Sequence, residues 1–125
     1  MLVGVQDVHV NVADMPRALA FYRDVLGMRV LDTSPWWTSL DFFGARIGLH
    51  GTGGASVPAI QHGDHGPLAG AVLTLRSTDL DADVAYLKAN GVPVLGRSDH
   101  AWGRIALIRD PDGNVLKLMQ PVSPS

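Results

Sequence analysis

Residues 4–27 read GVQDVHVNVADMPRALAFYRDVLG and carry the strongest fold signal in the chain. The first half of this stretch alternates apolar and polar residues with a period of two, which is the pattern of a half-buried β-strand. Valines at positions 8, 10 and 12 form one face, and Asp7, His9 and Asn11 form the other. The pattern predicts a strand over residues 5–12, with helices packed on its apolar face and a wetter concave surface on its polar face.

A helix is predicted to follow this strand directly. Asp14 is a suitable N-cap because its carboxylate accepts hydrogen bonds from the free N–H groups of the first turn. Pro16 is tolerated in that turn because those N–H groups have no helical partner. Apolar residues then recur at helical spacing, and Gly27 is a natural end. The sequence therefore predicts one helix between Asp14 and Gly27.

Length and composition exclude several classes of protein. The chain has 125 residues, of which 46% are hydrophobic, so it is long and apolar enough for one folded domain. The absence of cysteine excludes disulfides, thiolate nucleophiles and thiolate metal sites. The net charge of −2 and the lack of a basic cluster argue against a nucleic-acid partner. With no apolar run that spans a membrane and no signal peptide, we expect no membrane partner and a cytoplasmic location.

The strand and helix pattern occurs twice. Aligning Asp14 with Asp79 superimposes the order strand, helix, strand, strand, strand in both halves. The predicted strands are 5–12, 28–32, 36–43 and 46–50 in the first half, and 71–76, 92–95, 102–108 and 115–120 in the second. We therefore divide the single domain 1–125 into module one at 1–52, a Gly- and Pro-rich linker at 53–69, module two at 70–120 and a tail at 121–125.

Two motifs resemble those of a known family. Residues 14–27 are similar to the first-helix signature of the vicinal oxygen chelate superfamily, and residues 102–104 (WGR) and 110–114 (DPDGN) resemble its last hairpin. This superfamily includes glyoxalase I, bleomycin-resistance proteins and extradiol dioxygenases. The resemblance implies an α+β fold, in which two βαβββ modules form a cupped, mostly antiparallel sheet with helices on the outer face. It also implies a homodimer, with the modules paired either within one chain or across two.

The resemblance further implies a place for a divalent metal. In the enzymes of the superfamily, the metal ligands come from the first and last strands of the modules. The matching positions in this chain are Asp7 and Gly48 in the first half, and Val72 and Lys117 in the second. Glycine and valine have no donor atoms, and a lysine brings a positive charge toward the metal. The usual metal set does not carry over, so our first expectation is a protein without a cofactor.

A displaced metal set is the alternative. His9 lies two residues after Asp7, and His50 lies two residues after Gly48, so both are predicted on the polar face. Asp7, His9 and His50 would then form a two-histidine, one-carboxylate set for a divalent metal. In the simpler interpretation, both histidines are polar residues of the cup that bind neighbours or water. The alternatives differ in whether both imidazoles converge on one metal, at about 2.0–2.1 Å for zinc.

Aromatic and basic side chains are further candidates for ligand binding. Adjacent tryptophans in a strand point to opposite faces, and we assign Trp37 to the cup, with Trp102 as another aromatic wall. The simpler role for the tryptophans is packing in the core or in a dimer interface. Arg76 and Lys117 are predicted to anchor an anionic group of the ligand, unless they form salt bridges with Asp7 or another carboxylate.

The sequence leaves two functions open. The first is a glyoxalase- or bleomycin-resistance-like protein that binds a small aromatic or amphipathic molecule in the cup without the usual metal set. The second is a divalent-metal-dependent lyase or dioxygenase that uses the displaced Asp7, His9 and His50 site, so the sequence does not choose between a binding protein and an enzyme. The expected ligand-binding residues are Asp7, His9, Trp37, His50, Arg76, Trp102 and Lys117.

Overall fold

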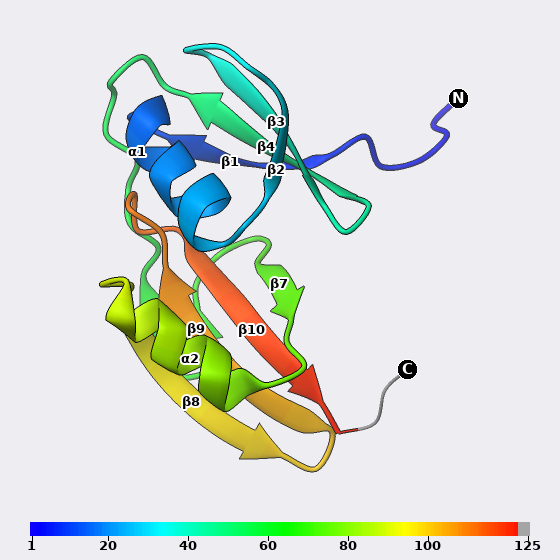
Figure 1. Ribbon diagram of the computed structural model, residues 1–125, viewed down its shortest axis with the longest axis vertical. Coiled ribbons are helices and arrows are strands. Elements are labelled where there is room, and N and C mark those ends of the chain that lie inside the picture. Colours follow the sequence, from blue (N-terminus) through cyan, green and yellow to red (C-terminus); the bar gives the residue numbers. More distant parts are fainter. Residues whose placement is uncertain (123–125) are drawn as a thin grey trace. The chain divides into compact units, whose positions relative to one another are not determined.

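The computed structural model describes residues 1–122 (Figure 1). The chain forms two compact units, which divide between Pro58 and Ala59, inside the 53–69 segment. Each unit has its own sheet, so the two are described separately. Across residues 1–122, no helix combines the length and the hydrophobicity needed to cross a membrane.

The first unit is a βαβββ module. Its elements are β1 (Val8–Val12), α1 (Met15–Leu19), η1 (Ala20–Val25), β2 (Arg29–Thr33), β3 (Trp37–Phe42) and β4 (Ala45–Gly51). Within residues 1–58 the strands form one sheet in the order β1-β4-β3-β2. The β1–β4 pair is parallel, and the β4–β3 and β3–β2 pairs are antiparallel. The first and last strands of the module therefore lie side by side.

The second unit repeats this topology. Its elements are β5 (His62–Gly63), β6 (Gly66–Pro67), β7 (Leu73–Arg76), α2 (Leu80–Ala89), β8 (Val94–His100), β9 (Gly103–Arg109) and β10 (Val115–Pro121). The main sheet has the order β7-β10-β9-β8, again with a parallel pair between its first and last strands. The predicted α+β class with two βαβββ modules is confirmed, and each main sheet is mostly antiparallel with one parallel pair.

The structure differs from the expected elements at several places. Strand β1 begins at Val8 and β7 begins at Leu73, three and two residues after their predicted starts. The short β5–β6 hairpin lies in the segment predicted as a plain linker. Strand β8 runs to His100, five residues past the predicted end at Leu95. At the end of the chain, Pro121 belongs to β10, and the rest of the predicted tail from position 123 lies outside the described residues.

The first helix begins as predicted but changes its geometry. Asp14 caps it, with a side-chain oxygen that accepts from the Arg17 N–H at 3.1 Å. After Leu19 the helix widens to a π-helix, in which the Leu26 N–H donates to the Phe21 carbonyl. A wider turn places neighbouring residues on one side, and both Phe21 and Tyr22 are buried here. A purely α-helical spacing does not anticipate that pair.

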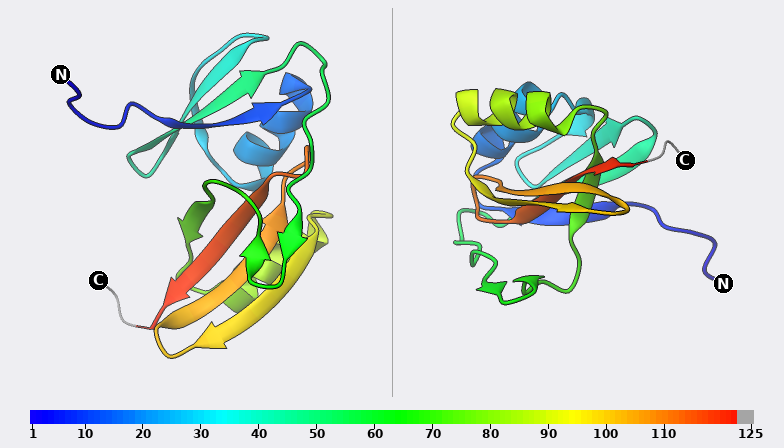
Figure 2. Two further views of the ribbon diagram at one scale, coloured as in Figure 1. Left: turned by 180° about the vertical axis from the view of Figure 1, so that it is seen from behind. Right: turned by 90° about the horizontal axis from the view of Figure 1, so that it is seen from below.

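Each sheet has a helix on one face only (Figure 2). In the second unit α2 is capped by Asp79, whose side chain accepts from the Ala82 N–H, and it buries Leu80, Val84 and Leu87. Most buried residues of the strands point to the helix side of their sheet, whereas Ile105, Leu107 and Met119 lie half-buried on the open face. The buried residues on the helix side are Val12, Thr38, Leu40, Ile47, Leu49, Ala106, Ile108, Leu116 and Leu118, and Val115 at the start of β10 is also buried. The alternate residues of each strand are left on an open face, and these carry the candidate site residues.

Candidate functional site

The open face of the first unit brings three rings together. Strand register puts His9 beside Gly48, and it puts Asn11 and Trp37 on either side of His50. The ring centroids of His9 and Trp37 are 5.5 Å apart, those of His9 and His50 are 5.9 Å apart, and those of Trp37 and His50 are 6.4 Å apart. We call His9, Trp37 and His50 the ring cluster. It contains three of the residues predicted to bind ligand.

Gly48 lies directly under the Trp37 ring of the ring cluster. A Cβ atom at this position would lie 2.4 Å from Cζ2 and Cη2 of Trp37, and 3.0 Å from Cβ of His9. The indole therefore lies across the β4 backbone at a place where only glycine leaves room. Its Nε1–H donates to Ser39 Oγ at 2.9 Å, which fixes the orientation of the ring. Sequence reasoning treated Gly48 only as a position without a donor atom, although a glycine inside a strand is a signal of such a close approach.

The two imidazoles of the ring cluster have polar neighbours on β1 and just before it. His50 Nδ1 lies 3.0 Å from Asn11 Oδ1, so this pair is hydrogen-bonded. His9 Nδ1 lies 4.0 Å from Asp7 Oδ1, where an ion pair forms when the imidazole is protonated. The side chain of His9 is 49% exposed and that of Asp7 is 23% exposed, so both remain accessible to a ligand. The polar face predicted for the first strand is thus the face that carries the ring cluster.

The metal positions of the superfamily do not fit this chain. Gly48 has no donor atom, and the indole of Trp37 fills the space that a longer side chain would need. Lys117, at the matching position of β10, brings an ammonium group instead of a carboxylate. Within residues 1–122, no group of three or more His, Asp or Glu side chains is placed to hold a metal ion. The displaced set of Asp7, His9 and His50 stays a prediction.

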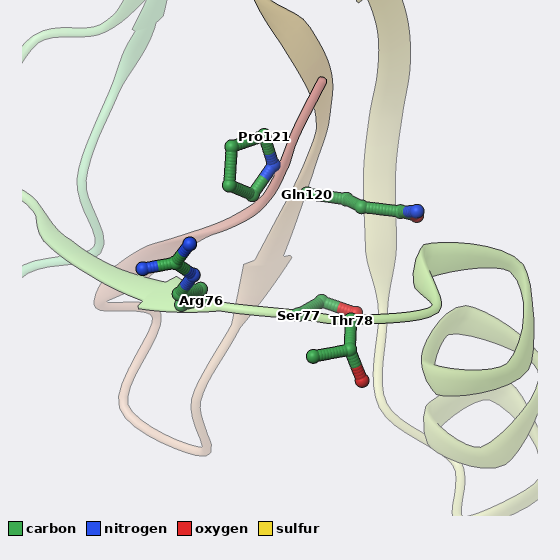
Figure 3. Close-up of a pocket in the computed structure, with 5 residues that line it drawn as sticks. All are labelled: Arg76, Ser77, Thr78, Gln120 and Pro121. Atoms are coloured by element: carbon green, nitrogen blue, oxygen red, sulfur yellow. The ribbon is translucent and has the colours of Figure 1, made fainter. Parts of the chain in front are cut away.

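The basic candidates lie on the open face of the second unit. Lys117 is beside Thr74 in the β10–β7 register, and Arg76 is beside Met119. A cavity of about 220 Å³ lies at the end of β7 (Figure 3), and its lining residues are Arg76, Ser77, Thr78, Gln120 and Pro121. Figure 3 shows Arg76 and Gln120 pointing to opposite sides of the strands. Gln120 Oε1 accepts from the Leu80 N–H at 2.8 Å, so this side chain caps α2.

The third tryptophan of the chain stacks on a histidine in the second unit. Trp102 lies in the turn between β8 and β9 and is 53% exposed. Its ring is 4.7 Å from that of His100 with an interplanar angle of 4°, and His100 Nε2 is hydrogen-bonded to Ser98 Oγ at 2.9 Å. Trp36, which precedes β3, is 63% exposed and does not belong to the ring cluster. Trp37 therefore lies on the open face of the first sheet, and its role in binding stays a prediction.

A charged network on the helix side of the second sheet is separate from the open face. Asp81, in the first turn of α2, accepts from Arg104 at 2.9 Å and from Arg97 at 2.7 Å. The hydrogen bond from Arg104, followed by that from Arg97, lowers the pKa of Asp81 to about 2. Arg104 also donates to Asp99. These contacts connect α2 to β8 and β9, so we assign the network to stability and not to the site.

Comparisons with known proteins agree with this architecture. The sequence model of the Glyoxalase/Bleomycin resistance protein/Dioxygenase superfamily matches residues 4–118. A comparison with curated proteins gives no match. Among solved structures, TnmS3, an antibiotic binding protein from Streptomyces sp. CB03234, is 34% identical with a TM-score of 0.70, and the match covers 96% of this chain and 97% of that chain.

More distant structures share the fold. FosX, a fosfomycin resistance protein from Listeria monocytogenes, is 15% identical with a TM-score of 0.76, over 98% of this chain and 96% of that chain. Lactoylglutathione lyase from Agrobacterium tumefaciens is 19% identical with a TM-score of 0.71, over 94% of this chain and 92% of that chain. At these identities the likeness supports the arrangement of strands and helices alone.

Proposed function

Because the chain belongs to the Glyoxalase/Bleomycin resistance protein/Dioxygenase superfamily, we propose that it binds a small aromatic or amphipathic molecule against the ring cluster, without the usual metal set. The observation that carries this proposal is the packing of the Trp37 indole against Gly48, with the rings of His9 and His50 beside it. The similarity to TnmS3, whose structure is that of an antibiotic binding protein, supports small-molecule binding as the activity.

The ring cluster has the chemistry that an aromatic ligand needs. Aromatic rings attract one another through offset or edge-to-face contacts worth about 0.5–1.5 kcal/mol per pair beyond the burial of their area. The ring of Trp37 is half-buried and held by Ser39, so little side-chain freedom is lost when a ligand packs on it. An amphipathic ligand places its apolar part on these rings and its polar groups against the imidazoles.

A separate proposal concerns the candidates of the second unit. Arg76 and Lys117 lie on the open face of that sheet, where they would bind an anionic group. Trp102, stacked on His100, would supply an aromatic surface of that unit. We further propose that the protein acts as a homodimer and works in the cytoplasm.

Calorimetric titration with a planar aromatic probe tests the proposal. We expect 2-methoxynaphthalene to bind with saturation, and we expect Trp37→Leu to weaken its affinity at least tenfold, which is about 1.4 kcal/mol. Trp36→Leu is the matched control, since Trp36 is the neighbouring exposed tryptophan outside the ring cluster, and its affinity should equal that of the wild type. Equal weakening in both variants, or no binding to the wild type, would contradict the proposal.

A further inference from the structure

The Asn11 contact determines which nitrogen of His50 carries a proton. Asn11 Oδ1 is an acceptor, so the Nδ1 atom of His50 at 3.0 Å donates to it and carries the hydrogen. In a neutral imidazole the other nitrogen, Nε2, is then an acceptor. Because β1 and β4 pair in parallel with Asn11 beside His50, the strand register holds this arrangement in place. His50 therefore presents a hydrogen-bond acceptor beside the indole of Trp37.

The same tautomer, with the proton on Nδ1, is favoured in His9. Its Nδ1 atom is the nitrogen that faces Asp7 Oδ1, at 4.0 Å, and a carboxylate favours a proton on the nitrogen nearest to it. The Nε2 atom of a neutral His9 is then also an acceptor. The indole N–H of Trp37 is already bound to Ser39 Oγ. In addition to the ring faces, the ring nitrogens of the cluster thus offer a ligand hydrogen-bond acceptors and no free donor.

We infer that the ring cluster selects aromatic ligands that carry a hydroxyl donor, such as phenols, through acceptance of the hydroxyl hydrogen by His50 Nε2, with His9 Nε2 as a second acceptor. This inference rests on the proposed function and names the class of its ligand. A site built to bind a hydroxyl discriminates against an analogue without it, because the acceptor then stays unpaired. The ring faces by themselves would bind either analogue.

A matched pair of probes separates the inference from the proposed function. The pair is 2-naphthol and 2-methoxynaphthalene, which share their aromatic body and differ in the hydroxyl hydrogen. By calorimetry at about pH 7.5, we expect 2-naphthol to bind the wild type at least tenfold more tightly. Equal affinity for the two probes would overturn the inference and leave the proposed function standing. If neither probe binds, the proposed function itself fails.

Substitution of the acceptor tests its assignment to His50. His50→Phe keeps a ring beside Trp37 and removes Nε2, so we expect the ratio of the two affinities to fall to about one, whatever the affinity of the variant for 2-methoxynaphthalene. His62→Phe is the matched control in the β5–β6 hairpin, and it should keep the preference. A preference retained in His50→Phe would overturn the assignment. The comparison of probes on the wild type does not depend on the folding of any variant.

Conversion of the acceptor to a donor is a second test. In Asn11→Asp the new carboxylate favours a proton on both nitrogens of His50, so Nε2 becomes a donor. We expect this variant to lose the preference for 2-naphthol and to gain at least threefold in affinity for 2-naphthoate. Gln6→Glu adds the same charge at an exposed position just before β1 and should change neither affinity. An unchanged preference in Asn11→Asp would contradict the inference.

Discussion

The geometry of the candidate site depends on a few single residues more than on any whole strand or helix. Gly48 makes room for Trp37, Ser39 holds the indole N–H, and Asn11 orients His50. None of these three residues has a reactive side chain. Their effect is to present two imidazoles and one indole in a fixed arrangement on an otherwise polar sheet face. Changes at these residues should therefore alter binding before they alter the fold.

Gly48→Ala tests the packing of the Trp37 indole against residue 48. The new Cβ would lie 2.4 Å from the Trp37 ring, so the ring must leave its place. We expect at least a tenfold loss of affinity for 2-methoxynaphthalene, a changed near-UV circular dichroism spectrum, and a loss of about 1–3 kcal/mol in unfolding free energy. Gly96→Ala is the control, because a Cβ there meets nothing within 4 Å. Wild-type affinity and spectrum in Gly48→Ala would contradict the assignment.

The polar face of the site could be predicted from the sequence, and its details could not. The period-two pattern placed His9 and Asn11 on one face, and the register confirms that His50 joins them. The role of Gly48 depends on which way the Trp37 ring turns, and strand periodicity carries no information on that torsion. The contact between Asn11 and His50 depends on the parallel pairing of two strands far apart in the sequence, which local patterns do not specify.

Metal content tests the displaced set of Asp7, His9 and His50. We expect tag-free protein to contain far less than one equivalent of divalent metal by elemental analysis, including after incubation with zinc, nickel or manganese, because the superfamily positions are filled by Gly48 and Lys117. A near-stoichiometric metal that is lost in the His9→Ala/His50→Ala variant would contradict this expectation. That result would favour the metal-dependent lyase or dioxygenase instead.

At the level of elements, helix α2 is attached to its sheet by polar contacts as well as by its apolar face. Gln120 from β10 caps its first turn, and Asp81 binds Arg97 and Arg104 from β8 and β9. The capping by Asp79 was predictable, since a helix N-cap is a local signal. The contacts of Gln120 and Asp81 were not, because their partners come from other strands. The π-helical turn was missed for a similar reason: tertiary packing of Phe21 and Tyr22 overrides local spacing.

The Asp81 network should make stability depend on pH at the acid end. Its folded pKa of about 2 lies below the usual value of about 3.9, so its contribution is present above about pH 4 and is lost as the pH falls toward 2. We expect the urea midpoint of the wild type to exceed that of Asp81→Asn slightly at neutral pH, and the difference to shrink near pH 2. The effect is small because the groups are exposed and screened by salt.

Asp64→Asn is the control for this comparison. Asp64 lies exposed in the β5–β6 turn and no salt bridge holds it among those found in residues 1–122. Its urea midpoint should follow that of the wild type from neutral pH to pH 2. If the difference between the wild type and Asp81→Asn were the same at both ends of this range, the lowered pKa of Asp81 would be contradicted.

For the whole molecule, the internal repeat was predictable and the content of each open face was not. Both units have the same strand order, and Asp14 and Asp79 cap the helices of both. The two open faces nevertheless differ: the first carries the ring cluster, and the second carries Arg76 and Lys117 beside apolar residues. Two copies of one topology thus present two different chemistries, one on each sheet.

The proposed homodimer is a prediction about the whole molecule in solution. Leu2, Val3 and Val5 are at least 85% exposed, and apolar side chains exposed together favour association with another surface. We expect light scattering after size-exclusion chromatography to give twice the chain mass of 13.3 kDa. The matched variant Val3→Ser/Val5→Ser should dissociate at higher protein concentration than the wild type. A monomer at all accessible concentrations would contradict the dimer.

The most direct test of ligand binding at the ring cluster is a nitrogen-15 NMR titration that follows the indole N–H signals of Trp36 and Trp37, assigned with single Trp→Phe variants. With 2-methoxynaphthalene added to saturation, the account predicts a shift of the Trp37 signal, because a bound aromatic ring changes the magnetic field at an indole N–H held by Ser39. The Trp36 signal should stay in place, since that residue lies outside the ring cluster. A saturable heat of binding with no shift of the Trp37 signal would contradict the account.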